Sequence, residues 1–383
     1  MLLRSLLSHG RPFSPSFSSY FVQSSQWQAK SAAISFPAPQ FKPQERLKPR
    51  QLLKVYAQLS KSNLTILIVL SAMSSVAVSP LPATLPVLLS TAVGTALCSA
   101  SANTFNQIQE VPFDAQMTRT RTRPLVRRAI TPLHAAGFAV ATGIAGPVIL
   151  WTMVNPTTAM LGLGNIALYA GVYTWMKRKS VWNTFVGAIV GGIPPLMGWT
   201  ACGGQLFPSA SYPIQTFLPS FLSNVPPLDP ALADNPLSAL ALFMLLYSWQ
   251  YPHFNALSYI VRGSYAQAGY HMMSVLNPMK NALISLRHSL ILVPVCSILV
   301  PLSGLTIWAY ALTTLIPNLI CVRAAWRYWR RGGEKEARTV FQHSLWYLPV
   351  MLGLMMFHKQ GMDWLEWMGI KTAEEKTEEA QEQ

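Results

Sequence analysis

Nine apolar stretches separated by short polar segments dominate the chain. A helix that crosses the hydrocarbon core of a bilayer needs about 20 mostly apolar residues. The stretches that meet this length lie at approximately 63–79, 84–106, 130–152, 157–176, 181–200, 235–257, 284–302, 304–322 and 340–358. The pattern therefore predicts an all-α membrane protein with nine transmembrane helices.

Basic residues alternate between the two ends of these predicted spans. Lysine and arginine occur in the connections near 107–129, 177–180, 258–281 and 323–339, whereas those near 80–83, 153–156 and 201–234 contain neither. Short loops rich in lysine and arginine stay on the side from which a membrane protein is inserted. The N-terminus is therefore predicted on the basic side of the membrane and the C-terminus on the opposite side.

The composition supports a membrane protein and excludes some other classes. Hydrophobic residues make up 51% of the chain and charged residues 11%, against about 25% charged residues in a typical soluble domain. The net charge of +15 comes from short loops rather than a basic domain, so nucleic-acid binding is not expected. The four cysteines show no CxxC spacing, and they indicate neither a disulfide framework nor a zinc site.

The two ends of the chain differ from the apolar domain, predicted over 55–360. Residues 1–50 are rich in arginine and serine and contain a single acid, Glu45, as is typical of a mitochondrial transit peptide with a disordered basic N-terminus; a disordered basic tail alone is the alternative. Residues 361–383 form an acidic tail, predicted to be disordered. These features predict a multi-pass protein of the mitochondrial inner membrane, with its N-terminus in the matrix and its C-terminus in the intermembrane space.

Only two acidic side chains, Glu110 and Asp114, occur between Arg46 and Leu228. Residues four apart share one face of a helix, so these carboxylates and the Asn106 amide are predicted to lie on one face. Such oxygens suit Mg²⁺. Pro112 lies between the two acids and predicts a kink or an end of the helix there. The alternative is a solvated helix end whose acids pair with nearby arginines.

Five arginines follow this acidic pair within one short segment. Guanidinium groups bind phosphate oxygens in a bidentate way, so the combination predicts a metal–diphosphate site at a membrane surface. The five are Arg119, Arg121, Arg123, Arg127 and Arg128.

The pattern Asn106-x3-Glu110-x3-Asp114, followed by the arginines, resembles the first signature of the UbiA superfamily of intramembrane prenyltransferases. It is most similar to the branch of that superfamily that farnesylates protohaem. The superfamily pattern uses aspartates, and Gln107 and Glu110 occupy two of their places here. The resemblance covers about residues 55–360 and implies nine helices bundled around a central cavity that opens to lipid.

A second segment, Trp249-Gln-Tyr251-Pro252-His253-Phe254, resembles the same branch. It implies that His253 acts on the acceptor side, where it could bind haem iron, hydrogen-bond a propionate or assist a water molecule; a structural histidine at a helix end is the alternative. Tyr265 is implied in diphosphate binding. No acid occurs from Asn235 to Gly333, and Ser264 stands where that branch has aspartate. Either hydroxyl and amide groups do more of the binding here, or one metal suffices.

The resemblance implies transfer of the farnesyl group of farnesyl diphosphate to the 2-vinyl group of protohaem IX. The product is haem O, and haem B is therefore a substrate rather than a cofactor. Haem A synthase, which would use haem O, is an implied partner. The implied site has Mg²⁺ on Asn106, Glu110 and Asp114, and the diphosphate on Arg119, Arg123 and Arg127.

Two other functions remain open from the sequence. The first is another UbiA-type prenyltransferase that acts on a quinone-precursor ring. The lack of a second acidic motif disfavours it. The second is a non-enzymatic carrier of an anionic metabolite. Carriers commonly contain internal repeats, and no convincing repeat is present.

Overall fold

The computed structural model describes residues 48–219, 222 and 234–362. In these residues the chain forms helices and no strand, with one isolated bridge between Thr306 and Lys359. Residues 1–47 of the predicted transit peptide and 363–383 of the predicted acidic tail lie outside the described residues, whereas Pro49 and Arg50 already belong to the first described helix. The elements are α2 (Pro49–Leu59), α3 (Ser62–Val78), α4 (Leu85–Asp114), α5 (Pro132–Met153), α6 (Pro156–Ile166), η1 (Ala167–Tyr173), α7 (Thr174–Met176), α8 (Asn183–Ala201), α9 (Pro236–Ile260), α10 (Arg262–Gln267), α11 (Met273–Leu276), α12 (Pro278–Pro294), η3 (Val295–Leu299), α13 (Val300–Leu302), α14 (Ala309–Thr313), α15 (Leu315–Arg331) and α16 (Gly333–Phe357).

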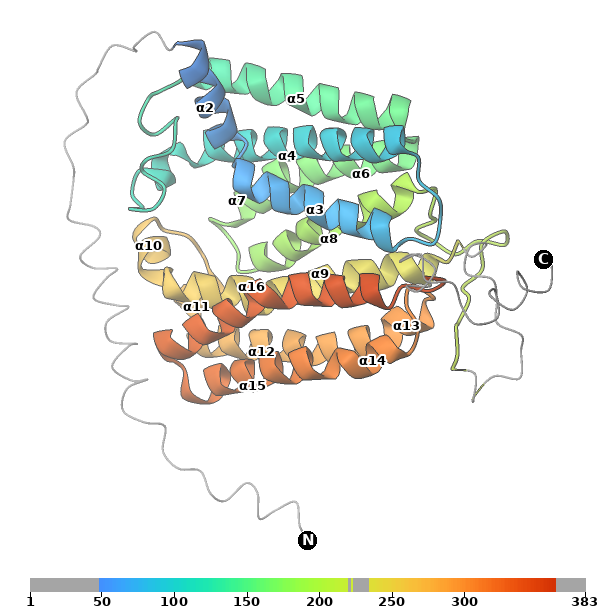
Figure 1. Cartoon of the computed structure of the whole chain (residues 1–383). Helices are drawn as coiled ribbons and strands as arrows, with labels where there is room; N and C mark the ends of the chain where they lie inside the picture. Colours follow the sequence, from blue (N-terminus) through green and yellow to red (C-terminus); the bar gives the residue numbers. More distant parts are fainter. Residues whose placement is uncertain (1–47, 220–221, 223–233, 363–383) are drawn as a thin grey trace.

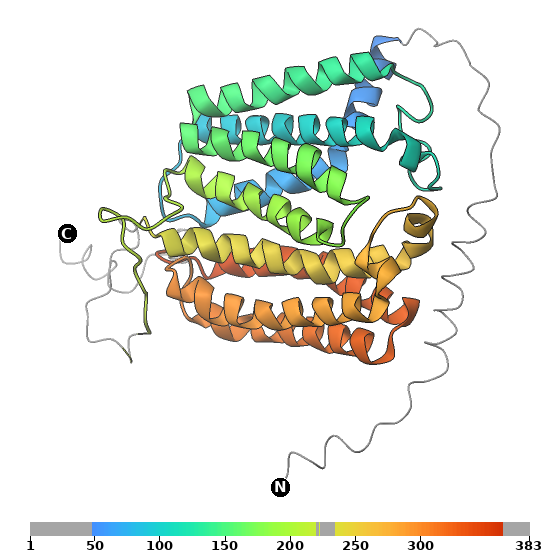
Figure 2. The same cartoon turned by 180° about the vertical axis from the view of Figure 1, so that it is seen from behind.

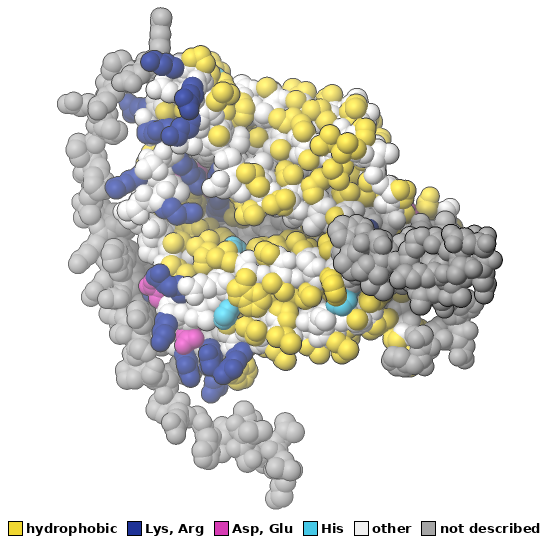
Figure 3. Space-filling view, viewed as in Figure 1, with side chains coloured by type: hydrophobic (Ala, Val, Ile, Leu, Met, Phe, Trp, Pro, Cys, Tyr) yellow, Lys and Arg dark blue, Asp and Glu magenta, His cyan; other side chains and the backbone are white. Residues whose placement is uncertain are grey.

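The long helices lie roughly side by side in two groups. Helices α2 to α8 form one group and α9 to α16 the other, as the views from both sides show (Figures 1 and 2). Helices α8 and α9 pack against each other, and α9 also contacts α12 and α16. The contact between α3 and α16 is much smaller, and the surface is hollowed along the boundary between the groups (Figure 3).

Several helices have the length and composition of membrane spans. Among the described residues, five are long and apolar enough to cross a bilayer, or up to six if α2 and α3, bent by 57° at their junction, form one broken span. Each of the nine predicted stretches falls largely within the described helices. The all-helical prediction is thus confirmed, whereas the number of spans stays a prediction.

The distribution of side chains is that of a protein surrounded by lipid. Large apolar side chains are exposed along the helix bodies, among them Leu67 (63%), Ile144 (61%) and Ile316 (68%), whereas lysine and arginine gather at one end of the bundle (Figure 3). Small and polar residues are buried where helices meet, as close packing in lipid requires. A Cβ atom on Gly198 would lie 2.0 Å from the Ala72 carbonyl oxygen, so α3 and α8 approach too closely for any larger residue.

Helix α4 is longer than the predicted span at 84–106 and continues to Asp114. Pro112 lies inside its last turn and does not end it. A proline inside a helix removes the N–H bond to the residue four before it, yet α4 continues for two more residues to Asp114, whose carboxylate is held by Arg123. The predicted end of the helix at Pro112 is therefore wrong, and Asp114 keeps its place on the face of Glu110.

Candidate active site

One face of α4 carries the three groups predicted as metal ligands. Asn106 and Asp114 are completely buried, and Glu110 is 4% exposed. The Asn106 Nδ2 atom donates to the Thr174 hydroxyl over 3.1 Å, which turns its Oδ1 atom away from α7. A solvated helix end is excluded by this burial, because a carboxylate in a dry interior must be compensated by nearby charge.

Two cations bind the carboxylates of α4. Arg123, in the turns after α4, donates to Asp114 Oδ2 and lies 3.6 Å from Glu110 Oε2. Lys177, just after α7, donates from Nζ to Glu110 Oε1 over 2.9 Å. Burial by itself lowers the pKa of Lys177, but the Glu110 carboxylate outweighs it and holds this pKa well above its ordinary value. Lys177 is therefore charged.

A third basic side chain, Lys61, reaches the same place from the junction of α2 and α3. Burial, together with the nearby Arg123 and Lys177, lowers the pKa of Lys61 to about 7. Its Nζ atom donates to Asn106 Oδ1 over 2.8 Å and lies 3.4 Å from the Tyr169 hydroxyl oxygen. Its backbone is left-handed, with φ at 49°, a conformation that is costly for residues other than glycine. Gln107 secures the junction, because its Nε2 atom donates to two carbonyl oxygens in the last turn of α2 at 3.0 and 2.9 Å.

These side chains form a charged cluster made of Lys61, Glu110, Asp114, Arg123 and Lys177. Arg123 and Lys177 balance the two carboxylates, and Lys61 adds a positive charge when it is protonated. An anion bound here would favour that protonated state, because a nearby opposite charge raises the pKa of a lysine. The charged cluster is therefore complementary to a multivalent anion, above all when a divalent cation is bound with it.

The predicted arginines divide between different places. Arg123 joins the charged cluster, whereas Arg127 donates to the Gln58 side chain over 2.7 Å at an exposed position. The Arg119 side chain is also exposed. The structure thus brings one of the three predicted diphosphate ligands to the carboxylates and leaves Arg119 and Arg127 at the surface nearby.

Tyr265 lies beside the end of α4. Its ring is 5.8 Å from the Tyr270 ring, which in turn is 5.5 Å from the ring of Phe113. The backbone N–H of His271 donates to the carbonyl oxygen of Lys177 over 2.9 Å. The loop that carries α10 and α11 is therefore fastened directly over the charged cluster.

His253, the third predicted catalytic residue, lies outside the charged cluster on α9 and faces α16. Its Nδ1 atom is 2.9 Å from the Ser344 hydroxyl oxygen, and its ring stacks on Trp249 with 4.7 Å between ring centres. The next residue, Phe254, packs against the buried cluster that contains Met117. His253 is thus one residue away from the contacts at the end of α4.

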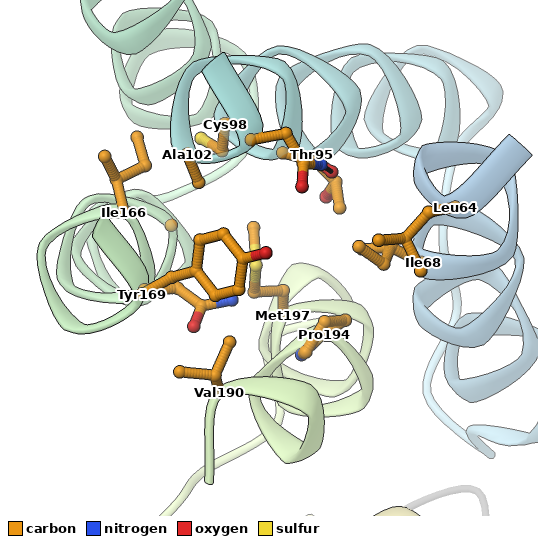
Figure 4. A pocket seen from close by; sticks show the side chains of 14 residues that line it. Leu64, Ile68, Thr95, Cys98, Ala102, Ile166, Tyr169, Val190, Pro194 and Met197 are labelled. Carbon is orange, nitrogen blue, oxygen red and sulfur yellow. Dashed lines mark hydrogen bonds between the residues drawn. The ribbon is translucent and has the colours of Figure 1, made fainter. Parts of the chain in front are cut away.

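An apolar pocket adjoins the charged cluster between α3, α4, α6, η1 and α8. Its empty volume is about 460 Å³, which includes space open to the surroundings. Tyr169, whose hydroxyl faces Lys61, projects into the pocket (Figure 4). Asn103 lines the end near the charged cluster, and Gly162 and Met197 line the part further along α4. The site thus consists of a polar centre and an apolar pocket that meet at Tyr169.

The oxygen atoms at the polar centre fit Mg²⁺. The Oδ1 atom of Asp114 is buried and has no hydrogen-bond partner in the described structure, so it is available to a cation. Among the described residues no group of three His, Cys, Asp or Glu side chains forms a metal site. Mg²⁺ commonly uses one or two carboxylates together with phosphate oxygens and water, so Glu110, Asp114 and the Asn106 amide are a sufficient set.

Two cations of the charged cluster were missed by sequence reasoning. Lys177 was assigned only to the basic loop near 177–180, and Lys61 was not singled out. The available signals were position and spacing: Lys61 is the last cation before the first span, and Lys177 follows Tyr173 by one helical turn. The π-helical segment η1, which often marks a functional site, was not foreseeable from the apolar pattern.

The fold and site define a helical membrane protein with a buried centre for a multivalent anion beside an apolar pocket. The sequence profile of the UbiA prenyltransferase family matches residues 65–346. The chain therefore belongs to the UbiA prenyltransferase family.

Similar proteins from fungi share a name. The mitochondrial protoheme IX farnesyltransferase of Neurospora crassa is 41% identical over 359 residues, which cover 90% of this chain and 66% of that protein. The protein of the same name from Yarrowia lipolytica is 44% identical over 327 residues, with 81% and 63% covered. The Kluyveromyces lactis protein is 41% identical over 346 residues, with 85% and 70% covered. The chain thus spans less than two thirds of the length of the first two relatives.

Solved structures support the fold. A digeranylgeranylglyceryl phosphate synthase superposes with a TM-score of 0.60 at 14% identity and covers 80% of this chain and 98% of its own. A UbiA homologue from Aeropyrum pernix K1 gives a TM-score of 0.54 at 17% identity, with 77% and 97% covered. A UbiA homologue from Archaeoglobus fulgidus, solved with DMAPP and Mg²⁺, gives 0.50 at 14% identity, with 78% and 98% covered. The UbiA-like fold is confirmed.

Proposed function

We propose that this protein transfers the farnesyl group of farnesyl diphosphate to the 2-vinyl group of protohaem IX and so forms haem O. The observation that carries the proposal is the junction of the buried charged cluster with the apolar pocket at Tyr169. A prenyl diphosphate has the same two parts, a polyanionic head and an apolar chain. The names of the fungal relatives supply the acceptor.

Recognition of the diphosphate head is assigned to the charged cluster. Arg123, Lys177 and Lys61 would turn from their present partners to phosphate oxygens, where a guanidinium binds in a bidentate way and an ammonium as a point charge. Arg119 and Arg127 lie at the exposed side of the cluster and would attract the anion as it enters. Tyr265 would close the site from the α10 loop.

Asn106, Glu110 and Asp114 would hold Mg²⁺ through side-chain oxygens, one of which, Asp114 Oδ1, has no other partner. When bound, Mg²⁺ supplies positive charge to the diphosphate oxygens as the leaving group departs. Lys177 and Arg123 add charge-assisted hydrogen bonds to the same leaving group.

The farnesyl chain would enter the apolar pocket and exclude water from its reactive end. The C1–O bond of farnesyl diphosphate breaks and releases diphosphate, and C1 bonds to the terminal carbon of the vinyl group. The cation left on the inner vinyl carbon takes a hydroxyl from water, which gives up a proton. A dry pocket protects the first cation from premature capture by water.

The reaction is tested by incubating membranes that contain the chain with labelled farnesyl diphosphate and protohaem. The expected product is haem O, identified by mass, with release of diphosphate. Label found on a quinone precursor instead of haem would indicate the other prenyltransferase function. Uptake of label without any product would indicate a carrier.

The location is proposed as the mitochondrial inner membrane, on the relatives' names and the predicted transit peptide over residues 1–50. Nine spans over 55–360 would place the N-terminus in the matrix and the tail over 361–383 in the intermembrane space, where haem O passes to haem A synthase. Protease added to mitoplasts should remove an epitope placed after Glu382 and spare one placed near Lys48. Protection of the C-terminal epitope would indicate an even number of spans and contradict the proposed orientation.

A further inference from the structure

The hydrogen bonds around His253 determine which of its ring nitrogens carries a proton. The Ser344 hydroxyl donates to the carbonyl oxygen of Phe341 over 2.6 Å. A hydroxyl has one proton and a carbonyl oxygen can only accept. When the Ser344 proton is in the bond to Phe341, the Ser344 oxygen, 2.9 Å from His253 Nδ1, accepts the N–H of this nitrogen. In a neutral ring the lone pair is then on Nε2.

The surroundings keep the ring neutral. No acidic residue occurs from Asn235 to Gly333, and among the described residues the acids on α16, Glu334 and Glu336, pair with Arg338 and Arg331. Glu336 lies eight residues from Ser344, which is about 12 Å along a helix. A protonated His253 would have no carboxylate to compensate its charge, and such a charge is costly in an apolar interior.

The Nε2 atom is available to a ligand. It has no hydrogen-bond partner in the part of the chain that the structure describes. It is also not one of the fully buried polar atoms without a partner, so it is partly accessible. The ring is fixed between two aromatic side chains, 4.7 Å from Trp249 and 5.1 Å from Phe341 between ring centres. Trp249 is itself held by Ser344, whose carbonyl oxygen accepts from the indole N–H over 2.9 Å.

We propose that His253 binds the acceptor haem through its iron with Nε2, and that Ser344 is the positioning residue that keeps this nitrogen unprotonated. The inference rests on the proposed function, and it selects one of the three roles open for His253. A lone pair on Nε2 repels a propionate carboxylate. A base that took a proton from water would become a cation without a partner. Binding to iron needs the lone pair and leaves the ring neutral.

The hydrogen-bond chain also strengthens the ligand. A histidine that binds a metal commonly donates its other N–H to a fixed acceptor, which sets the tautomer and raises the basicity of the binding nitrogen. Here the chain runs from His253 through the Ser344 hydroxyl to the Phe341 carbonyl, and each bond polarises the next.

The test is a titration of the full-length protein in lipid nanodiscs with haem B, followed by absorption spectroscopy. The wild type should show the bands of imidazole-bound haem. His253→Ala should lose these bands, and added imidazole should restore both the bands and turnover. His343→Ala is the matched control, because His343 lies on α16 next to Ser344 and its Nδ1 atom accepts from Trp346 instead. This variant should keep the bands.

Ser344 is tested by the same titration. Ser344→Ala should weaken haem binding about tenfold or more, the effect of losing a partner behind a metal ligand, whereas Ser344→Thr, which keeps the hydroxyl, should restore it. Farnesyl diphosphate affinity should stay unchanged in both variants. Wild-type affinity for haem in Ser344→Ala would refute the positioning role.

Two outcomes separate this inference from the proposed function. If the wild type makes haem O but its bound haem shows no imidazole bands, or if His253→Ala keeps them, iron binding by His253 is refuted and the proposed function stands. If the wild type binds no haem and forms no haem O, the proposed function fails and the inference with it.

Discussion

Glu110→Gln removes one negative charge from the centre of the charged cluster and keeps the size of the side chain. Glu110 is the carboxylate that Lys177 contacts at 2.9 Å and Arg123 approaches at 3.6 Å, and it is 4% exposed. Arg123 keeps its second partner, Asp114, and Lys177 lies at a helix end from which a long side chain can reach the membrane interface. We therefore expect the variant to insert and fold.

The loss of activity follows from the electrostatics of this centre. Two unit charges about 4 Å apart interact by about 4 kcal/mol at an effective dielectric constant of about 20. Removing one preorganised electrostatic group from an enzyme typically costs about 2.7–4 kcal/mol, or about 10²–10³-fold in rate. Glu110→Gln should thus reduce haem O formation at least about a hundredfold, and Asp114→Asn, which alters a completely buried carboxylate, should do the same.

Haem O is measured by mass after incubation of membranes with farnesyl diphosphate and protohaem, and protein abundance by immunoblot. Glu334→Gln is the matched control, because this glutamate pairs with Arg338 at an exposed position on α16, and it should retain activity. Near-normal haem O formation by both Glu110→Gln and Asp114→Asn, at normal abundance, would refute the metal face on α4. Loss of the protein itself would show that the carboxylates serve the fold.

Three further predictions concern the prenyl donor. Arg123→Lys should weaken farnesyl diphosphate binding about tenfold and leave haem binding intact, since an ammonium cannot bind two oxygens as a guanidinium does. The control Arg121→Lys, at an exposed position, should have no effect. Equal loss of binding for both substrates in Arg123→Lys would indicate misfolding. Lys177→Met should lower turnover about a hundredfold. The control is Lys179→Met, because the Lys179 amine lies 4.3 Å from the centre of the Trp175 ring, and its turnover should stay within about twofold of the wild type, as for other surface groups. Similar rates for the two variants would count against the charged cluster. Gly162→Leu should shift the preference from farnesyl to geranyl diphosphate, because a Cβ atom there would already lie 3.0 Å from Cys98 Sγ and 3.3 Å from Met197 Cε. Gly164→Leu is the control, because a Cβ atom at Gly164 meets nothing within 4 Å. An unchanged preference in Gly162→Leu would exclude the pocket as the binding site of the prenyl chain.

Much of the fold could be predicted because it depends on local pattern. Apolar stretches of sufficient length predict helices wherever lipid replaces water, since backbone groups must then be paired within the helix. The spacing of Asn106, Glu110 and Asp114 predicts a shared face for the same reason, as the helical period is set by the backbone. The error at Pro112 arose because the ion pair of Asp114 with Arg123, beyond the proline, is a tertiary contact that the local pattern does not show.

The site depended on residues far apart in the chain. Lys61 and Lys177 reach Asn106 and Glu110 across 45 and 67 residues, and no period in the sequence relates them. The arginines are close in sequence but differ in their contacts. Arg127 donates to Gln58 at the surface, whereas packing places Arg123 against Asp114.

By itself, the sequence determined the helical class, the apolar lengths and the acidic face of α4, because each is a property of neighbouring residues and the helical period. Only the tertiary structure decided which basic side chains bind that face, where the apolar pocket begins, and that the hydroxyl of Ser344 lies at hydrogen-bond distance from His253 Nδ1 across 91 residues. These contacts arise from the packing of separate helices, whose relative rotation is set by small residues and buried polar groups spread over the whole bundle.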